Sequence, residues 1–387
     1  MTQPTASQSR PAILCVVGAR PNFMKIAPII AALRAAGIRA PLLHTGQHYD
    51  AAMSDGFFTD LGIPPPDINL EVGSASHAVQ TASIMLKFEP VLDQVRPAAV
   101  LVVGDVNSTI ACALVAAKKG VGVIHVEAGL RSFDRAMPEE INRVLTDQIS
   151  DLLYITERSA LANLAREGIA ADKVRFVGNV MIDTLRRNLD RATPAARTMA
   201  GAGAGPAFAD GRAYSVLTLH RPSNVDEPAT LERLLRTVGR IAADFPVVFP
   251  VHPRTRARIG DLGLAGLIER PEVLTLPPLG YLEMLGVMAG ARLVLTDSGG
   301  IQEETTALGI PCLTLRENTE RPITVAEGSN TVVGTDPARI LAAYDDIRAT
   351  GGKAGRIPEL WDGRAAERIA ADLTLWLATA QGADVSA

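Results

Sequence analysis

The chain has 387 residues, of which 47% are hydrophobic, and 38 basic against 42 acidic residues give a net charge of −4. This length and apolar content are enough for a sizeable core and indicate about two domains. The sequence contains no basic tail or stripe, which argues against a nucleic-acid partner and against binding to a membrane surface. No apolar run approaches the roughly 18 residues of a membrane span, and the N-terminus MTQPTASQSRP lacks an apolar signal core. We therefore expect a soluble cytoplasmic protein.

The three cysteines, Cys15, Cys112 and Cys312, lie far apart within apolar runs. Their spacing matches neither a metal site nor a redox motif. We interpret them as small buried hydrophobic residues in a reducing cytosol.

Short apolar runs alternate with helical patterns along the first half of the chain. The predicted strands are 12–17, 40–46, 98–105, 121–129, 151–156 and 174–179. The segments predicted to be helical between and after them include 22–37, 51–62, 108–120, 159–168 and 181–189. Strands that are apolar throughout, each followed by a helix, predict a parallel sheet covered on both faces, as in a doubly wound domain.

The composition changes at 194–211, PAARTMAGAGAGPAFADG, which is rich in alanine and glycine and has no clear period. We expect a flexible insertion near a domain junction there. Its G-A-G-A-G resembles a dinucleotide-binding fingerprint only superficially, because no strand precedes it and no helix follows it.

The alternation then restarts. Strands are predicted at 214–220, 245–252, 272–279, 291–300 and 310–315, with helical segments such as 231–244 between them. The fold class is therefore α/β, with two doubly wound Rossmann-like domains that face a central cleft. We expect an N-terminal domain over 1–183, a C-terminal domain over 184–360, and a C-terminal helix in 361–387 that packs back on the N-terminal domain.

Polar residues follow several strands of the first domain. GARPNFMK places Arg20 and Lys25 beside the start of a helix, where two cations suit a phosphate better than a solvated turn does. In VVGDVNST, Asp105 ends a central strand, and it is explained equally well as a cap of the following helix.

The stretch HVEAGLRSFDRAMPEEINR, 125–143, holds an unusual density of charge after a buried strand. Glu139 and Arg143 are four residues apart on a predicted helix, so charge pairing explains part of the pattern. It does not explain Glu127, an acid at the end of an apolar strand. His125, within that strand, is interpreted as a hydrogen-bonded core residue rather than a ligand.

Polar residues also end two strands of the second domain. His220 follows one of them and can donate to a phosphate or act as an acid or base. Another strand runs into Ser298, Gly299 and Gly300 at a helix start, where free N–H groups and the helix dipole favour an anion such as a diphosphate.

Two further residues extend this anion site. Glu304, one turn into the same helix, fits either a helix cap or an acceptor for ribose hydroxyls. Arg321, in the loop RENTERPIT, fits either an anion clamp or an ordinary surface loop.

Taken together, these motifs resemble the UDP-N-acetylglucosamine 2-epimerase family of the non-hydrolysing type, on a fold like that of GT-B glycosyltransferases. The motifs occur in family order over about residues 12–335. They are GARPNFMKIAP, TGQHYD, VVGDVNST, HVEAGLRSFDRAMPEEINR, GNVMIDTL, LHRPSN, PVHPRTR, TDSGGIQEE and ENTERP.

The resemblance implies a role for each candidate residue. The diphosphate would be held by Ser298, Gly299 and Gly300 and surrounded by Arg20, His220 and Arg321, while Glu304 would bind the ribose. The sugar side would be lined by Lys25, Asp105, Glu127, Glu139 and Arg143, with Asp105, Glu127, Glu139 and His220 as the catalytic candidates. No metal and no cofactor is implied.

The resemblance also implies the chemistry: interconversion of UDP-GlcNAc and UDP-ManNAc through elimination of UDP, giving 2-acetamidoglucal, and re-addition. It implies a UDP-sugar as the only small-molecule partner, a homodimer, and a place in polysaccharide biosynthesis. The sequence leaves open hydrolysis to N-acetylmannosamine and UDP, epimerisation of a modified UDP-sugar, and, from another class, a GT-B glycosyltransferase.

The sequence departs from the pattern of many bacterial members after the His-Arg pair. Those members place an arginine and a glutamate there, linked to an activating second substrate molecule. This chain has Pro222, Ser223 and Asn224 instead, although Gln47 and His48 are present.

Overall fold

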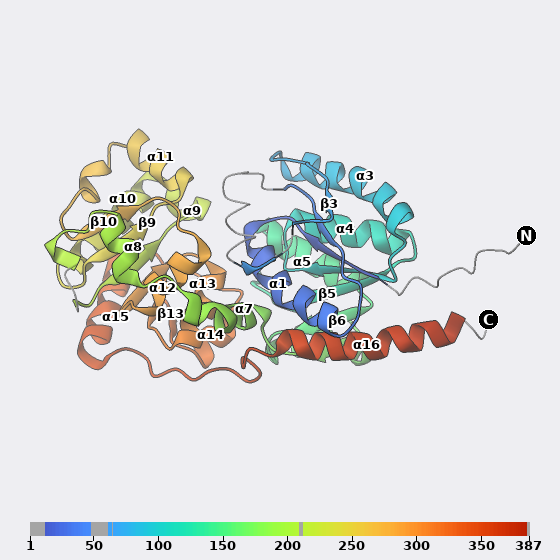
Figure 1. Cartoon of the computed structure of the whole chain (residues 1–387). Helices are drawn as coiled ribbons and strands as arrows, with labels where there is room; N and C mark the ends of the chain where they lie inside the picture. The colour runs from blue at the N-terminus through green and yellow to red at the C-terminus, as the bar shows by residue number, and fades with distance from the viewer. Residues whose placement is uncertain (1–11, 48–60, 64, 209–211, 385–387) are drawn as a thin grey trace, which may run out of the picture. The chain divides into compact units, whose positions relative to one another are not determined.

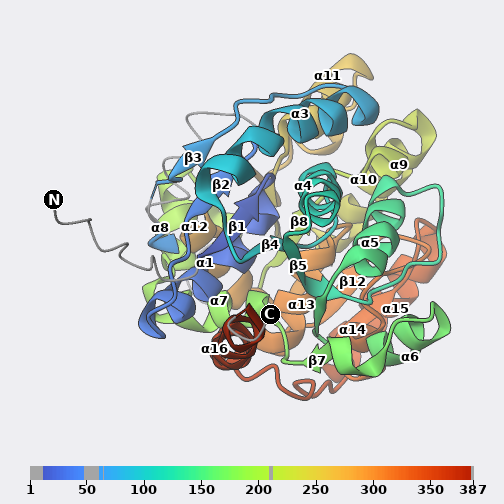
Figure 2. The ribbon, with the colours of Figure 1, turned by 90° about the vertical axis from the view of Figure 1, so that its right-hand side faces the viewer.

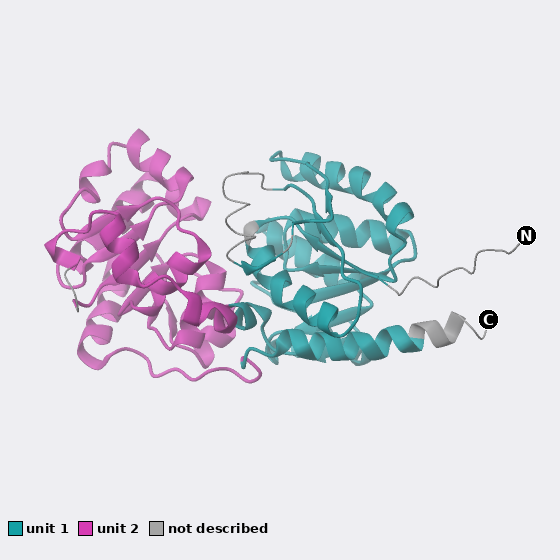
Figure 3. Cartoon of the chain, in the orientation of Figure 1, with its two compact units in different colours: residues 1–184, 362–387 teal, residues 185–361 magenta. Residues whose placement is uncertain are grey.

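The computed structural model describes residues 12–47, 61–63, 65–208 and 212–384 of the chain (Figure 1). The predicted helix at 51–62 lies almost entirely outside these residues. The chain forms two compact units, residues 1–184 with 362–387 as unit 1 and residues 185–361 as unit 2 (Figure 3). Unit 2 is one continuous segment, whereas unit 1 is completed by the C-terminal end of the chain.

The described part of unit 1 contains a seven-stranded parallel sheet in the order β3-β2-β1-β4-β5-β6-β7. The strands are β1 Ile13–Val17, β2 Leu42–His44, β3 Ile68–Asn69, β4 Ala99–Val103, β5 Gly122–Ala128, β6 Leu152–Ile155 and β7 Val174–Phe176. Every residue of β1 and β4 is buried, as expected for strands covered on both faces.

Helices cover both faces of this sheet. They are α1 Arg20–Ala35, α3 His77–Val95, α4 Asn107–Lys118, α5 Pro138–Ile149, α6 Ser159–Arg166 and α16 Ala365–Asp384, with a 3-10 helix, η1, at Ala171–Lys173. Helix α7, Val180–Asn188, begins in unit 1 and ends in unit 2. Helix α4 packs between α3 and α5, and α16 packs against α1. Figure 2 shows the sheet between these two groups.

The described part of unit 2 contains a six-stranded parallel sheet in the order β10-β9-β8-β11-β12-β13. The strands are β8 Ser215–Thr218, β9 Val247–Pro250, β10 Val273–Leu276, β11 Leu293–Thr296, β12 Cys312–Thr314 and β13 Asn330–Val332. The helices are α8 Ala195–Gly201, α9 Pro222–Val225, α10 Pro228–Ile241, α11 Pro253–Asp261, α12 Tyr281–Ala289, α13 Gly299–Leu308, α14 Pro322–Ala326 and α15 Pro337–Thr350. Short 3-10 helices are η2 Leu189–Arg191, η3 Pro206–Phe208 and η4 Ala265–Leu267.

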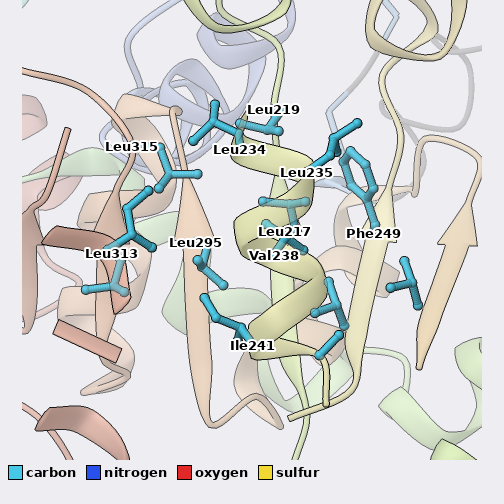
Figure 4. Close-up of a cluster of buried hydrophobic side chains, with 14 of the residues drawn as sticks. Leu217, Leu219, Leu234, Leu235, Val238, Ile241, Phe249, Leu295, Leu313 and Leu315 are labelled. Carbon is cyan, nitrogen blue, oxygen red and sulfur yellow. The ribbon is translucent and has the colours of Figure 1, made fainter. Parts of the chain in front are cut away.

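The core of unit 2 forms where α10 lies on the sheet (Figure 4). Leu234, Leu235 and Val238 of α10 are buried against side chains of the central strands, among them Leu217 and Leu295. Apolar residues spaced at three and four along α10 place one face on the sheet, which is the pattern of an amphipathic helix.

The predicted fold class is confirmed: both sheets are parallel and doubly wound. In each sheet the strand order reverses once, between β1 and β4 in unit 1 and between β8 and β11 in unit 2. In open α/β sheets, ligands bind beyond the carboxyl ends of the strands at such a switch point. The loops that follow β4, β8 and β11 carry Asp105, His220 and Ser298, and Arg20 begins the helix that follows β1.

The expectation of a flexible insertion at 194–211 was wrong for its described part. The segment forms α8, whose Met199 is buried in a core cluster with Tyr214 and Val287. Just before α8, the Thr193 amide donates to the carbonyl of Leu282 in α12 at 3.0 Å. This close approach needs Gly286, because a Cβ there would lie 1.8 Å from the Thr193 oxygen.

Candidate functional site

Glu127 ends β5 in an unusual backbone conformation. Its φ is 73°, in the left-handed region that bulky L-residues rarely adopt. The pairing of β5 with β6 shifts register between Val126 and Ala128, so Glu127 is the extra residue of a β-bulge. A bulge redirects a side chain at the end of a strand, and such strain is stored where the side chain's direction matters.

The Glu127 carboxylate forms an ion pair with the ammonium group of Lys25, and both side chains are almost fully buried. The cation comes from α1. Because that helix begins at Arg20, Lys25 lies in its second turn. The Lys25 ammonium also lies beside Gly104, where a Cβ would be 3.1 Å from it.

Asp105 faces a cation of its own, Arg143 of α5. One carboxylate oxygen of Asp105 accepts from Nη2 and Nε of Arg143 at 2.5 and 3.1 Å. Arg143 Nη1 donates to Glu140 at 2.7 Å, which fixes the guanidinium between two acids. An arginine beside a carboxylate favours the ionised form, which is the form that accepts a proton.

Glu140 is a residue whose importance the sequence did not reveal. It is buried, and besides Arg143 its carboxylate accepts from the backbone N–H and hydroxyl of Ser132 and from the N–H of Phe133, each at 2.9 Å. It therefore anchors the loop between β5 and α5. The available sequence signal was a second acid beside Glu139 at a helix start, which an ordinary helix cap explains equally well.

Two predicted residues of unit 1 are not brought into these pairs. The Glu139 side chain is partly exposed, and within the described part of the chain it makes no hydrogen bond or ion pair. The side chain of Arg20 lies outside the described residues, as does His48. Gln47 is buried, and its side-chain oxygen accepts from the N–H and hydroxyl of Ser108 at 3.1 and 2.7 Å.

In unit 2, His220 stands at the end of β8 beside a buried acid, Asp297. Its Nδ1 is 2.8 Å from an Asp297 oxygen, and the ring is about 39% exposed while Asp297 is fully buried. Asp297 also accepts from the backbone N–H groups of His220 and Arg221. Burial alone would raise the pKa of Asp297, but these donors and the nearby His220 hold it below its ordinary value.

This arrangement orients the histidine. Asp297 fixes Nδ1, so Nε2 is the nitrogen left to act on a ligand. Asp297 was not among the predicted site residues, although an acid at the end of an apolar strand is the same signal that singled out Asp105 and Glu127.

Ser298, Gly299 and Gly300 form the N-terminal end of α13, as predicted. A Cβ on Gly299 would lie 2.5 Å from Oε1 of Glu320, so this position has no room for a side chain. Glu320 is buried and accepts from Arg316 at 2.8 Å. Burial opposes its ionisation, but the charges of Arg321 and Arg316 hold the pKa of Glu320 well below its usual range.

Arg321 and Glu304 border the same helix. Arg321 is buried and its Nε is 2.9 Å from Glu303, one residue before Glu304. Burial raises the pKa of Tyr281 strongly, and the carboxylate of Glu304 beside it raises it further. Arg321 and Glu304 are thus held by neighbours inside unit 2 and are not part of an ordinary solvated loop.

Each unit therefore has a distinct chemistry at its switch point. Unit 1 presents two strand-end carboxylates, Asp105 and Glu127, each paired with a buried cation. Unit 2 presents a helix N-terminus built around glycine, with an oriented histidine beside it, which suits a phosphate or diphosphate. Two doubly wound α/β units in one chain match the architecture of the GT-B-like class.

The chain belongs to the UDP-N-acetylglucosamine 2-epimerase family, whose model matches residues 31–374. The UDP-N-acetylglucosamine 2-epimerase of Methanocaldococcus jannaschii is 42% identical over 333 residues, which cover 85% of this chain and 90% of that one. The UDP-2,3-diacetamido-2,3-dideoxy-D-glucuronate 2-epimerase of Pseudomonas aeruginosa is 43% identical over 326 residues, covering 83% and 88%.

Solved structures agree with this assignment. The crystal structure of M. jannaschii UDP-GlcNAc 2-epimerase in complex with UDP-GlcNAc and UDP matches with a TM-score of 0.86 and 40% identity, covering 94% of this chain and 99% of that one. The Neisseria meningitidis enzyme bound to UDP-GlcNAc matches with a TM-score of 0.84 and 31% identity, covering 94% and 99%. The family resemblance read from the motifs is thereby confirmed.

None of the described helices combines the length and the apolar character that crossing a membrane requires.

Proposed function

We propose that this protein interconverts UDP-GlcNAc and UDP-ManNAc by epimerisation at C2 of the sugar. The observation that carries the proposal is the pair of strand-end carboxylates, Asp105 and Glu127, each held by a buried cation. Epimerisation at C2 requires a base that removes the proton from C2, and a carboxylate can serve as one. The chain also belongs to the same family as the UDP-GlcNAc 2-epimerases.

UDP binding is assigned to unit 2. The N–H groups at Ser298, Gly299 and Gly300 would receive the diphosphate, since the N-terminus of a helix favours an anion. His220 would add a hydrogen-bond donor and Arg321 a positive charge. Arg20, whose side chain lies outside the described residues, is assigned to the diphosphate from the family resemblance alone. Glu304, fixed beside Tyr281, would accept from the ribose hydroxyls.

The reaction begins with removal of the C2 proton. The electron pair of the C2–H bond becomes the C1–C2 double bond while the bond from C1 to the diphosphate oxygen breaks, which gives 2-acetamidoglucal and UDP. The departing oxygen gains negative charge, so the donors of unit 2 stabilise the transition state more than the ground state.

UDP then adds back to C1 while a proton is delivered to the opposite face of C2. Two proton-handling groups are needed, one for each face. Asp105, Glu127 and Glu139 are assigned to this work together. Lys25 pairs with Glu127 and Arg143 pairs with Asp105. Glu139 has no such partner in the described residues, so its environment differs from theirs.

Incubation with UDP-GlcNAc in D2O, followed by NMR, tests the proposal. Incorporation of deuterium at C2 together with the appearance of UDP-ManNAc is the expected result. Release of free N-acetylmannosamine and UDP would show the hydrolysing reaction instead. An unchanged substrate, under conditions where UDP binds, would contradict the proposal for this sugar.

A second candidate is epimerisation of a modified UDP-sugar, favoured by the 43% identity to the P. aeruginosa enzyme named for a diacetamido glucuronate. Running the same D2O assay with both substrates compares them directly by kcat/KM. Transfer of the sugar to an added acceptor, without C2 exchange, would identify a GT-B glycosyltransferase.

We further propose a homodimer that acts in the cytoplasm and supplies a nucleotide sugar for polysaccharide biosynthesis. All three cysteines are free and buried, which is typical of a protein in a reducing compartment. The family resemblance supports the homodimer, and sedimentation at micromolar concentration tests it, with a monomer as the contradicting result.

A further inference from the structure

Within β5, Gly122–Ala128, the titratable side chains are His125 and Glu127. The proposed chemistry uses Glu127 and leaves His125 without a role. It lies two residues before Glu127 and pairs in the sheet with Val102 of β4 and Leu153 of β6. Its side chain is fully buried, and both ring nitrogens have partners, which confirms its interpretation as a hydrogen-bonded core residue.

The two partners of His125 are both acceptors. Nδ1 is 2.7 Å from a carboxylate oxygen of Asp147, and Nε2 is 2.8 Å from the carbonyl oxygen of Gly104. A neutral imidazole carries one N–H and can serve only one acceptor. Since a carbonyl oxygen can only accept, Nε2 must carry a hydrogen, and the hydrogen between Nδ1 and Asp147 is a second one.

The surroundings of Asp147 decide which atom holds that second hydrogen. The other carboxylate oxygen accepts from the N–H of Gly129 at 3.0 Å and lies 2.7 Å from Nη2 of Arg131. Arg131 is itself held by Glu167, at 2.5 and 2.8 Å. An arginine and an amide donor both stabilise the ionised carboxylate, so the proton belongs to the histidine.

The position of this ion links it to Asp105. The carbonyl that His125 binds belongs to the peptide between Gly104 and Asp105, and Gly104 has a φ of 69°. Asp147 lies four residues after Arg143 on α5, the residue that binds the Asp105 carboxylate. The Asp105 turn is thus attached to α5 in three ways. Arg143 binds its side chain, Asn142 donates to the Asp105 carbonyl at 2.9 Å, and His125, itself held by Asp147, binds the Gly104 carbonyl.

We propose that His125 is an imidazolium in the folded protein and is a positioning residue that fixes the Gly104–Asp105 peptide, and with it the Asp105 carboxylate, for proton transfer at C2. The positioning role rests on the proposed function, because it is measured by the rate of C2 exchange. The protonation of the ring does not depend on that function. Fixing one edge of a peptide matters because a misplacement of about 1 Å can cost roughly 100-fold in rate.

The first experiment reads the protonation directly, on the full chain labelled with 15N-histidine. The ring nitrogens of the six histidines are assigned by single substitutions. Both nitrogens of His125 are expected to show the shifts of a doubly protonated ring, because each faces an acceptor. His44 is an internal contrast, because burial lowers its pKa and its Nε2 has no partner within the described residues. A neutral His125 would overturn the imidazolium.

The second experiment measures the C2 exchange rate of His125→Phe and Asp147→Asn. Both are expected to lower kcat about 100-fold, while the KM for UDP-GlcNAc and the Kd for UDP change less than about threefold. Asp147→Asn serves as the second variant in case His125→Phe fails to fold. In Asp147→Asn, the NMR spectrum should show a neutral His125.

The outcomes separate the two proposals. If the wild-type protein shows no C2 exchange, the proposed function fails while the NMR result still decides the state of His125. If the wild-type is active and both folded variants keep kcat within about threefold, the positioning role is overturned. A parallel loss of UDP binding would also overturn it, since that indicates general damage to the fold.

Discussion

At the scale of single residues, the unit 1 site depends on charges that are buried in pairs. Glu127 occupies a left-handed backbone position and meets Lys25, and Asp105 meets Arg143. Removing Lys25 or Glu127 alone leaves the other one buried without this opposite charge, which costs about 3–5 kcal/mol. The pairs therefore serve two purposes, holding the acids ionised and fixing their direction.

Glu127→Gln is expected to lower the rate of C2 exchange at least about 100-fold, the range typical of a lost general base. UDP binding should stay within about threefold, because the assigned UDP residues lie in unit 2. NMR in D2O measures the exchange and calorimetry the binding. Glu89→Gln, an exposed acid of α3 near Lys119, is the matched control and should leave both unchanged. Exchange near the wild-type rate in Glu127→Gln would remove this residue from the proton path.

Asp297 makes the stability of unit 2 depend on pH. The pKa of Asp297 is lower in the folded protein than in the unfolded chain. At a pH between these two pKa values, Asp297 is protonated in the unfolded chain and ionised in the folded protein, so raising the pH favours folding. The stabilisation by Asp297 is complete above its pKa in the unfolded chain, about 3.9, and is lost as the pH falls through its pKa in the folded protein. Asp297→Asn should thus reduce the free energy of unfolding at pH 7 more than at pH 3, as measured with urea. An equal loss at both pH values would contradict this.

At the scale of elements, α13 presents its first turn only because Gly299 lacks a side chain. The position where a Cβ would stand is occupied by Glu320, which in turn is held by Arg316. A methyl group at 299 must therefore displace a buried, ionised carboxylate or shift the start of the helix.

Gly299→Ala is expected to weaken UDP binding at least about tenfold, equivalent to about 1.4 kcal/mol. Calorimetric titration with UDP measures the effect. Gly260→Ala provides the comparison, because a Cβ at that helical position of α11 meets nothing within 4 Å. The control should bind UDP normally. Normal affinity in Gly299→Ala would show that the first turn of α13 does not receive the diphosphate.

Helix α8 gives an element-scale prediction about stability. Met199→Ala should destabilise unit 2 by about 2–5 kcal/mol, the usual cost of truncating a buried methionine. Arg197→Ala, on the exposed side of the same helix, should change the free energy of unfolding by less than about 0.5 kcal/mol. Equal effects in the two variants would mean that α8 does not pack as described.

Helix α8 also shows why part of the fold could not be predicted from the sequence. Alanine is the best helix former, but a short Ala/Gly-rich segment has too few apolar residues to show a helical period. Met199 becomes a core residue only because Gly286 lets a distant helix approach. Strands β3 and β13 also escaped prediction. Both are short edge strands that carry polar residues, Asn69 in β3 and Asn330 and Thr331 in β13, so no long apolar run marks either of them. The central strands β1, β4 and β5 were predicted within one or two residues at each end.

At the scale of the whole molecule, the two units differ in how the chain completes them. Residues 185–361 form unit 2 without interruption. Unit 1 needs the C-terminal end, where Asp183 accepts from the first N–H groups of α16 and Tyr154 donates to Asp372. Contacts across such long sequence separations make α16 part of the first unit.

The segment 185–361, expressed alone, is expected to fold and to bind UDP but not to exchange the proton at C2. Its own sheet and core supply the stability, while the carboxylates assigned to the proton transfer lie in unit 1. Circular dichroism, calorimetry with UDP and the D2O assay test the three parts. The same segment carrying Gly299→Ala is the binding control. A folded segment without UDP affinity would contradict the assignment of the nucleotide to unit 2.

The sequence by itself determined the two doubly wound sheets and the places where polar residues leave them. Apolar strands that alternate with helices admit few other arrangements, and a strand end is visible as the residue where the apolar run stops. Asp105, Glu127, His220 and Ser298 were found in this way.

Only the tertiary structure decided what those residues meet. Lys25 reaches Glu127 from another element, Glu140 anchors a loop, Asp297 orients His220, and His125 lies between Asp147 and Gly104. The physical reason is that pairing and burial depend on distances between segments far apart in the chain. An acid that caps a helix and an acid that positions a catalytic group have the same local sequence, and they differ only in the groups that the fold brings to them.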